Sequence, residues 1–174
     1  MKHNSLLLVL FVSACFLRGS VARAQPKTSP ALRPPAVPLV TCDPYLSVWS
    51  FDDRLTDSNT HHWTGKPQTL ISLVRIDDKP YRVAGAQPSN VPAMEQKTLQ
   101  VLPTRTIYTF TGGGVLLTLT FTTPMLPDDL DVLTRPLTYV AWHAASTDSK
   151  PHKVAAPTQV RIPSGTDSPA ATFA

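Results

Sequence analysis

Two adjacent histidines and a tryptophan, His61, His62 and Trp63, form a group of side chains that could do chemistry. Imidazoles bind metal ions or transfer protons, and an indole can stack on a flat ligand. Neighbouring side chains on an extended segment point in opposite directions, so one ion rarely engages both histidines. No Cys or His follows at the three- or four-residue spacing of zinc sites. We therefore expect no metal here and retain the three residues as candidates for ligand binding.

A second group consists of three carboxylates, those of Asp128, Asp129 and Asp131. Carboxylate oxygens suit calcium, but the segment lacks the glycine and the distal glutamate of an EF-hand loop. A solvated turn before Leu133 is the favoured interpretation. The sequence thus predicts neither a bound metal nor another cofactor.

Motifs for covalent or nucleotide-dependent catalysis are missing from the sequence. There is no Gly-x-Ser-x-Gly elbow, phosphate-binding loop or dinucleotide fingerprint. The three glycines at 112–114 are flanked by strand-like segments, which predicts a hairpin turn. Cys42 would need a histidine held nearby to act as a nucleophile, and a buried apolar thiol is favoured instead. No catalytic residue is assigned, and whether the chain is an enzyme stays open.

The three tryptophans could stack on sugars, or they could belong to a core. Trp49 and Trp142 alternate with other apolar residues, as core residues of a strand do. Trp63 lies in a polar segment, 52–68, whose composition predicts a loop. At about 17 residues this loop is longer than most connections, so we expect it to be functional or packed by its own aromatic side chains.

Short strands would have to position these residues. Alternation over Tyr45–Phe51 predicts a core strand, and residues 69–76 and 81–83 around a turn at 77–80 predict a hairpin. The same alternation predicts four further strands, at Thr98–Leu102, Thr106–Thr111, Val115–Thr123 and Leu137–Ala145. The predicted fold class is therefore all-β, an antiparallel sandwich-like domain over residues 38–150.

The start of the chain predicts export. Leu6–Leu17 is apolar but too short for a membrane span, and an Ala-x-Ala cleavage site ends at Ala24. Residues 1–24 are therefore expected to be a signal peptide, and the protein to be secreted or periplasmic. Lipid attachment at Cys15, which would make the protein a lipoprotein, is the alternative. Residues 25–37 form a proline-rich lead-in.

The net charge, the cysteines and the end of the chain lead to three further expectations. Without residues 1–24, 13 of the 16 Lys and Arg residues oppose 12 Asp and Glu residues, a net charge of about +1, which gives no support to nucleic-acid binding. Cys42 is then the one remaining cysteine, so no internal disulfide is expected. Residues 151–174, with regularly spaced prolines amid Ala, Ser and Thr, predict a disordered tail.

Several strings of residues resemble the N-terminal region of the secreted glutaminase A family. They occur in the same order as in that family and contain rare residue types. The strings are PLVTCDPYLSVWS at 38–50, HWTGKPQ at 62–68, LVRID at 73–77, FTTPMLPDDL at 121–130 and Arg135-Pro136. The resemblance covers roughly residues 35–154.

This resemblance implies a β-rich N-terminal part that is followed by a much larger helical region, with hydrolysis of L-glutamine to glutamate and ammonia as the reaction. No catalytic residue is carried over, because the chain ends before the helical region. After about Val154 the sequence departs from the family pattern, so we expect a truncation or a frameshift in the gene. The missing C-terminal helical domain is the expected partner.

Two functions follow as hypotheses. The first is a non-catalytic N-terminal β module of a glutaminase-like protein, built to pack against the rest of that protein. It predicts exposed apolar surface and an unpaired sheet edge. The alternative is a free-standing secreted module that binds carbohydrate or another ligand through His61, His62 and Trp63.

Overall fold

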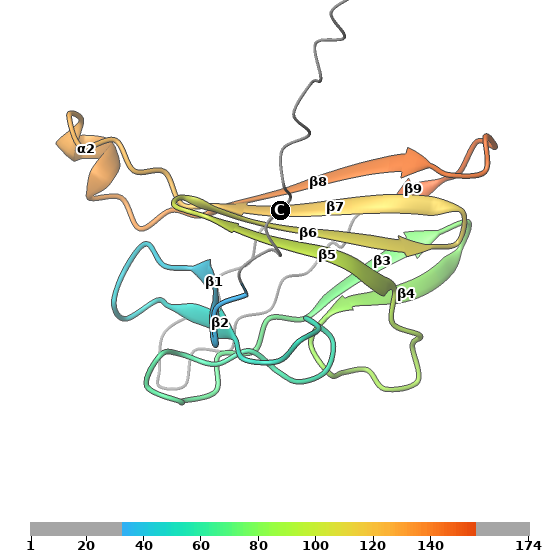
Figure 1. Cartoon of the computed structure of the whole chain (residues 1–174), viewed down its shortest axis with the longest axis horizontal. Coiled ribbons are helices and arrows are strands. Elements are labelled where there is room, and N and C mark those ends of the chain that lie inside the picture. The colour runs from blue at the N-terminus through green and yellow to red at the C-terminus, as the bar shows by residue number, and fades with distance from the viewer. Residues whose placement is uncertain (1–32, 156–174) are drawn as a thin grey trace, which may run out of the picture. The chain divides into compact units, whose positions relative to one another are not determined.

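The computed structural model describes residues 33–155, which form antiparallel strands and one short helix (Figure 1). The strands belong to three sheets, of two, three and four strands. The predicted all-β antiparallel fold is therefore confirmed. The expected signal peptide at 1–24, most of the lead-in at 25–37 and the later part of the expected tail lie outside the described residues.

The largest sheet is a four-stranded antiparallel meander in the order β5-β6-β7-β8. Its strands are β5 Glu95–Leu102, β6 Arg105–Gly112, β7 Val115–Thr122 and β8 Tyr139–Ser146. The four strands predicted in this region are confirmed, with ends shifted by a few residues. Side chains alternate between two faces of such a sheet, so one face can be buried while the other meets water.

The inner face of this sheet carries much of the core. Tyr108 and Phe110 of β6 are buried, and their rings stack with 6.0 Å between centroids. On β7, Leu119 pairs with Tyr108 and Leu117 pairs with Phe110. Phe121 lies on the same face, and all three β7 residues are buried. Burial of a side chain of this size contributes about 1.5–3 kcal/mol to stability. The predicted alternation of leucine and threonine in β7 is confirmed, because its threonines are all half-exposed.

Two smaller sheets pack on this inner face (Figure 1). One joins β1 (Val37–Val40) to β2 (Val48–Ser50), and the other contains the hairpin of β3 (Ser72–Ile76) and β4 (Lys79–Ala84). Their buried side chains form one cluster with those of β6 and β7, and include Val37, Leu39, Val48, Val74, Ile76 and Val83. The result is the expected sandwich-like arrangement of two layers.

The β3–β4 turn confirms the predicted hairpin and explains its residues. Asp77 and Asp78 form the two-residue turn, with φ angles of 48° and 66°. A type I′ turn needs positive φ at both positions, and aspartate tolerates this conformation better than most residues. The turn between β6 and β7 uses Gly113 and Gly114 at φ 57° and 76°, so the glycine run is a hairpin turn as predicted.

The predicted core strand over Tyr45–Phe51 is wrong in extent and in orientation. Only Val48–Ser50 is a strand, because Asp43 Oδ1 accepts hydrogen bonds from the backbone N–H groups of Tyr45 at 2.7 Å and Leu46 at 3.3 Å. This side-chain turn interrupts the extended backbone. Val48 and Ser50 are buried, whereas Tyr45 is 89% exposed and Phe51 44% exposed. Trp49 is half-buried rather than a core residue.

The end of the described chain also differs from expectation. β9 (Val154–Ala155) pairs with β3, through Arg75 opposite Ala155 and Ile76 opposite Val154. Strand structure thus continues past the expected domain end at residue 150. Alternation alone could not predict β9, because a two-residue strand carries no measurable period.

Candidate functional site

The long loop between β2 and β3 is anchored by a buried leucine and by polar groups from other strands. Leu55 is buried, and its backbone N–H donates to Gln96 Oε1 at 2.9 Å. Gln96 Nε2 donates in turn to Asp53 O at 3.0 Å, and Arg82 of β4 donates to Thr56 O at 2.8 Å. An aliphatic side chain and two strand residues therefore hold the first part of the loop in place.

His61, the first ligand-binding candidate, extends the sheet of β2. Its backbone N–H and C=O pair with Trp49 at 3.0 and 2.8 Å. Its half-buried imidazole packs edge-on against Phe51, with 6.0 Å between ring centroids. These contacts give His61 a structural role in holding the loop beside β2.

His62 and Trp63 lie together on one backbone carbonyl. Pro44 O accepts hydrogen bonds from Trp63 Nε1 at 3.1 Å and from His62 Nε2 at 2.8 Å. A carbonyl oxygen only accepts, so His62 carries a proton on Nε2. His62 Nδ1 accepts from the Thr64 N–H at 3.2 Å and lies 2.7 Å from Thr64 Oγ1. Both ring nitrogens are thus engaged within the loop, and neither offers a lone pair to a metal ion.

Tyr45 joins these residues at the surface, which the sequence pattern did not predict. Tyr45 follows Pro44 directly, and its carbonyl accepts from Gln68 Nε2 at 3.4 Å. Tyr45 is 89% and Trp63 61% exposed. Each of the two loops therefore presents one exposed aromatic side chain, and the loops are joined through the Pro44 and Tyr45 carbonyls. The turn-forming pair Asp43-Pro44 is the sequence signal that could have moved Tyr45 out of the predicted strand.

A second exposed region is made of apolar rather than aromatic and polar side chains. It consists of the end of β5, the start of β8 and the connection between β7 and β8, at the end of the large sheet where α2 lies (Figure 1). We call the following exposed residues the apolar surface: Leu102, Met125, Leu126, Leu130, Leu133, Leu137 and Tyr139. A cluster of this kind marks interaction sites in folded proteins.

The short helix α2 (Leu130–Leu133) belongs to this apolar surface and buries none of its residues. Asp129 caps its N-terminus, because its Oδ1 accepts from the Val132 N–H at 3.1 Å, and Asp131 lies in the first turn. Carboxylates at these positions satisfy free N–H groups and favour the helix dipole. The carboxylates considered for calcium thus include a helix cap.

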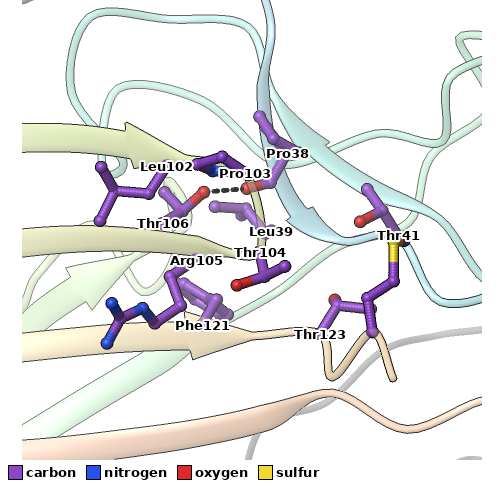
Figure 2. Close-up of a pocket in the computed structure, with 11 residues that line it drawn as sticks. Pro38, Leu39, Thr41, Leu102, Pro103, Thr104, Arg105, Thr106, Phe121 and Thr123 are labelled. Carbon is purple, nitrogen blue, oxygen red and sulfur yellow. Dashed lines mark hydrogen bonds between the residues drawn. The ribbon is translucent and has the colours of Figure 1, made fainter. Parts of the chain in front are cut away.

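A pocket opens beside the apolar surface, between β1 and the β5–β6 turn (Figure 2). Two of its lining residues are hydrogen-bonded to each other: Thr106 Oγ1 donates to Pro38 O at 2.6 Å. Its other lining residues are Leu39, Phe121, four more residues of the β5–β6 turn, Thr41, Thr123 and Met125. Among the lining residues Arg105 alone is ionisable, and none carries a carboxylate, imidazole or thiol. The pocket suits an apolar contact better than acid–base or nucleophilic chemistry.

A cluster of three ionisable side chains lies at the other end of the large sheet, beside the β6–β7 turn. His152 Nδ1 lies 2.6 Å from Asp77 Oδ2, and His152 Nε2 lies 2.8 Å from Asp148 Oδ1. The hydrogen bonds to Asp77 and Asp148 raise the pKa of His152, and the bonds from His152 lower the pKa of both carboxyls. Backbone N–H groups of Lys153 and Lys150 also bind the two carboxylates. With both nitrogens bound to carboxylates, this histidine is a structural cross-link.

The described residues thus form a β module with two exposed groups of side chains, the aromatic pair Tyr45 and Trp63 and the apolar surface. No helix within residues 33–155 is long and apolar enough to cross a membrane. Residues 9–95 match a domain of unknown function (DUF4964), and residues 104–161 match another domain of unknown function (DUF5127). The first match covers half of the chain, and the chain belongs to the DUF4964 family.

A curated relative agrees with the resemblance found in the sequence. The chain is 30% identical over 155 residues to a protein named Glutaminase A from Aspergillus oryzae. The alignment covers 83% of this chain but 22% of the relative, so the chain spans about a fifth of the length of the protein that it matches. The predicted resemblance to glutaminase A proteins is confirmed. No solved structure matches this chain.

Proposed function

We propose that this chain is a non-catalytic N-terminal β module of a glutaminase-like protein, an L-glutamine amidohydrolase, and that it packs against the rest of that protein. The observation that carries the proposal is the apolar surface at one end of the large sheet. Monomeric soluble proteins rarely expose contiguous apolar regions unless these contact a partner.

The similarity to Glutaminase A supports a partner within the same protein. The chain corresponds to 22% of the length of that relative, which leaves a much larger region for such a contact. The resemblance implies that this region is a helical domain. Leu102 and Met125 line the pocket as well as the apolar surface, so a protruding apolar side chain of the partner could anchor in it.

The edge of the large sheet supports the same proposal. Within the described residues, β8 pairs with β7 alone, so the other side of β8 is an unpaired edge. Trp142 and Val140 of β8 are half-buried on the inner face. Unpaired edges attract further strands or need a cover. A contact with the rest of a larger protein would supply that cover.

Coexpression tests the proposed contact. This chain would be coexpressed with the part of the Aspergillus oryzae Glutaminase A that the alignment does not cover, and the two would be copurified. We expect copurification, and loss of it in Leu130→Asp and Met125→Asp. Trp63→Asp is the matched control, because Trp63 is also large and 61% exposed but lies outside the apolar surface. Failure to copurify, or equal loss in the control, contradicts the proposal.

The non-catalytic role has a separate test. The purified chain is expected to release no ammonia from L-glutamine, since no carboxylate, imidazole or thiol lines the pocket. Hydrolysis that scales with the concentration of the chain, and that is lost together with the chain on immunodepletion, would make it an enzyme.

Secretion is part of the proposal and rests on the apolar run at 6–17 and the Ala-x-Ala site. Intact-mass measurement of the exported protein tests it. We expect a chain that begins at Gln25. A lipid-modified chain that begins at Cys15 would establish the lipoprotein alternative.

A further inference from the structure

We propose that Trp63 and Tyr45 form an aromatic platform that binds the pyranose ring of a polysaccharide. This binding would be independent of the proposed packing against a larger protein. The apolar surface and the platform share no residue, so the two functions can be separated by mutation.

The indole of Trp63 is held in place before any ligand arrives. Its Nε1 donates to Pro44 O at 3.1 Å, and His62 donates to the same oxygen at 2.8 Å. The imidazole of His62 packs beside the indole, with 5.3 Å between centroids and 39° between the ring planes. A side chain fixed in this way loses little conformational entropy when a ligand binds, and this raises affinity.

Exposure separates Trp63 from the other two tryptophans. Trp63 is 61% exposed, whereas Trp49 and Trp142 are half-buried. The exposed part of a large aromatic side chain adds no burial on folding, but it contributes contact area when a ligand covers it. Tyr45 is 89% exposed and directly follows Pro44, whose carbonyl binds the indole, so it is the second ring assigned to the platform.

The chemistry of the platform favours a sugar ring. The face of an aromatic ring is electronegative, so it attracts the weakly positive C–H groups on the flat face of a pyranose. The hydroxyl groups at the rim of the sugar need polar neighbours, and exposed Thr64 and Lys66 lie in the same loop as the indole. The apolar surface, in contrast, is made chiefly of leucine and methionine, which suit a protein partner.

The tautomer of His62 indicates that this residue positions the platform rather than binding the ligand itself. Its Nε2 proton goes to Pro44 O, and its Nδ1 is occupied by Thr64. The imidazole therefore has no nitrogen left for a ligand and acts by positioning the indole. Among the candidates from the sequence, Trp63 would contact the ligand, His62 would position it, and His61 would hold the loop to β2.

Affinity gel electrophoresis of the full chain tests the platform. The gels would contain barley β-glucan, xylan, galactomannan or glycol chitin, each a soluble polymer of pyranose rings. We expect at least one polymer to retard the chain. Trp63→Ala should weaken this retardation by about tenfold or more, as for other aromatic anchors, and Tyr45→Ala should weaken it less. Trp63→Phe should keep part of it, because a flat ring remains.

The matched control is Leu130→Asp, which changes an exposed residue of the apolar surface and should leave retardation unchanged. Circular dichroism of each variant establishes that it is folded. Absence of retardation on all four polymers overturns the proposal, as does equal retardation of the native chain and Trp63→Ala. Retardation that Leu130→Asp abolishes would assign the binding to the apolar surface. The two proposals can fail separately. Gel retardation does not depend on copurification with the Glutaminase A region, and copurification does not depend on gel retardation.

Discussion

The imidazole of His152 binds the carboxylate of Asp77 at 2.6 Å, although 75 positions separate the two residues. Asp77 belongs to the turn between β3 and β4, and His152 lies just before β9. The second nitrogen of His152 binds Asp148 at 2.8 Å. This arrangement fastens the end of the described chain to the three-stranded sheet, beside the strand pairing of β9 with β3.

The first prediction concerns pH. The pKa of His152 is raised above 6.5, chiefly by Asp77 and then by Asp148, so its contribution is fully present below pH 6.5 and is lost as pH rises through the raised pKa. The pKa values of Asp77 and Asp148 lie below 3.8, chiefly because of His152, so their contributions are lost as pH falls through those lowered values. The cross-link should therefore stabilise the fold most between pH 3.8 and pH 6.5.

Thermal unfolding of His152→Asn at a series of pH values checks this expectation. The Tm difference from the native chain should be largest near pH 5 and should shrink toward pH 9 and pH 2. His143→Asn is the control, since His143 is exposed on β8, and its Tm difference should not vary in this way. A constant difference for His152→Asn across the series would contradict the ionic cross-link.

The second prediction concerns Gly114, which supports the cross-link from the β6–β7 turn. A Cβ at Gly114 would lie 2.7 Å from His152 Nε2 and 2.9 Å from Asp148 Oδ2. Its φ of 76° is unfavourable for other residues, at about 1–2 kcal/mol. Gly114→Ala should therefore lower the free energy of unfolding by more than this strain alone, because the bonded side chains must also move apart.

Gly65→Ala is the control that measures the backbone strain of positive φ without a steric clash. Gly65 has φ 84°, yet nothing lies within 4 Å of the position of its Cβ. Urea unfolding should show a smaller loss for Gly65→Ala than for Gly114→Ala. In the background of His152→Ala the extra loss at Gly114 should become smaller, because the clash with His152 is gone while that with Asp148 Oδ2 remains. Equal losses at the two glycines would show that the contact with His152 carries no weight.

Sequence patterns predicted the large sheet well because its strands are long enough to show alternation. Burial alternates along both strands: Thr106, Tyr108 and Phe110 are buried in β6, and every second residue from Val115 to Phe121 is buried in β7. β1 and β9 are too short for a period, and β9 also depends on pairing with β3, which is far away in the sequence. Tyr45 was misplaced because the side chain of Asp43 replaces strand hydrogen bonds with a local turn, and such competition is invisible to periodicity.

The candidate residues show the same division. Trp63 was marked by its type and its polar surroundings, which are local properties. Tyr45 and the cross-link at His152 depend on contacts between segments that are far apart in sequence. The leucines of the apolar surface have the composition of a core, so only the fold reveals that they are exposed.

The third prediction concerns the anchor of the long loop. Gln96→Ala removes the side-chain amide that binds the loop backbone at two points. The buried Leu55 N–H loses its acceptor, and the Asp53 carbonyl loses its donor. An unsatisfied buried group costs about 1–3 kcal/mol, and we expect a loss of this size in urea unfolding. Hydrogen exchange of the Leu55 amide should accelerate. Gln100→Ala, an exposed glutamine of the same strand, should leave both measurements unchanged; equal effects of the two variants would remove the loop anchor.

The fourth prediction compares two leucines that differ in burial. Leu119 of β7 is fully buried against the core, and Leu130 of α2 is 68% exposed on the apolar surface. Leu119→Ala leaves a cavity and should cost about 2–5 kcal/mol of stability. Leu130→Ala should change the free energy of unfolding by less than about 0.5 kcal/mol, as is usual for exposed positions. If chemical unfolding gave a large loss for Leu130→Ala, that side chain would be part of the folding core, and the apolar surface would no longer be free to bind a partner.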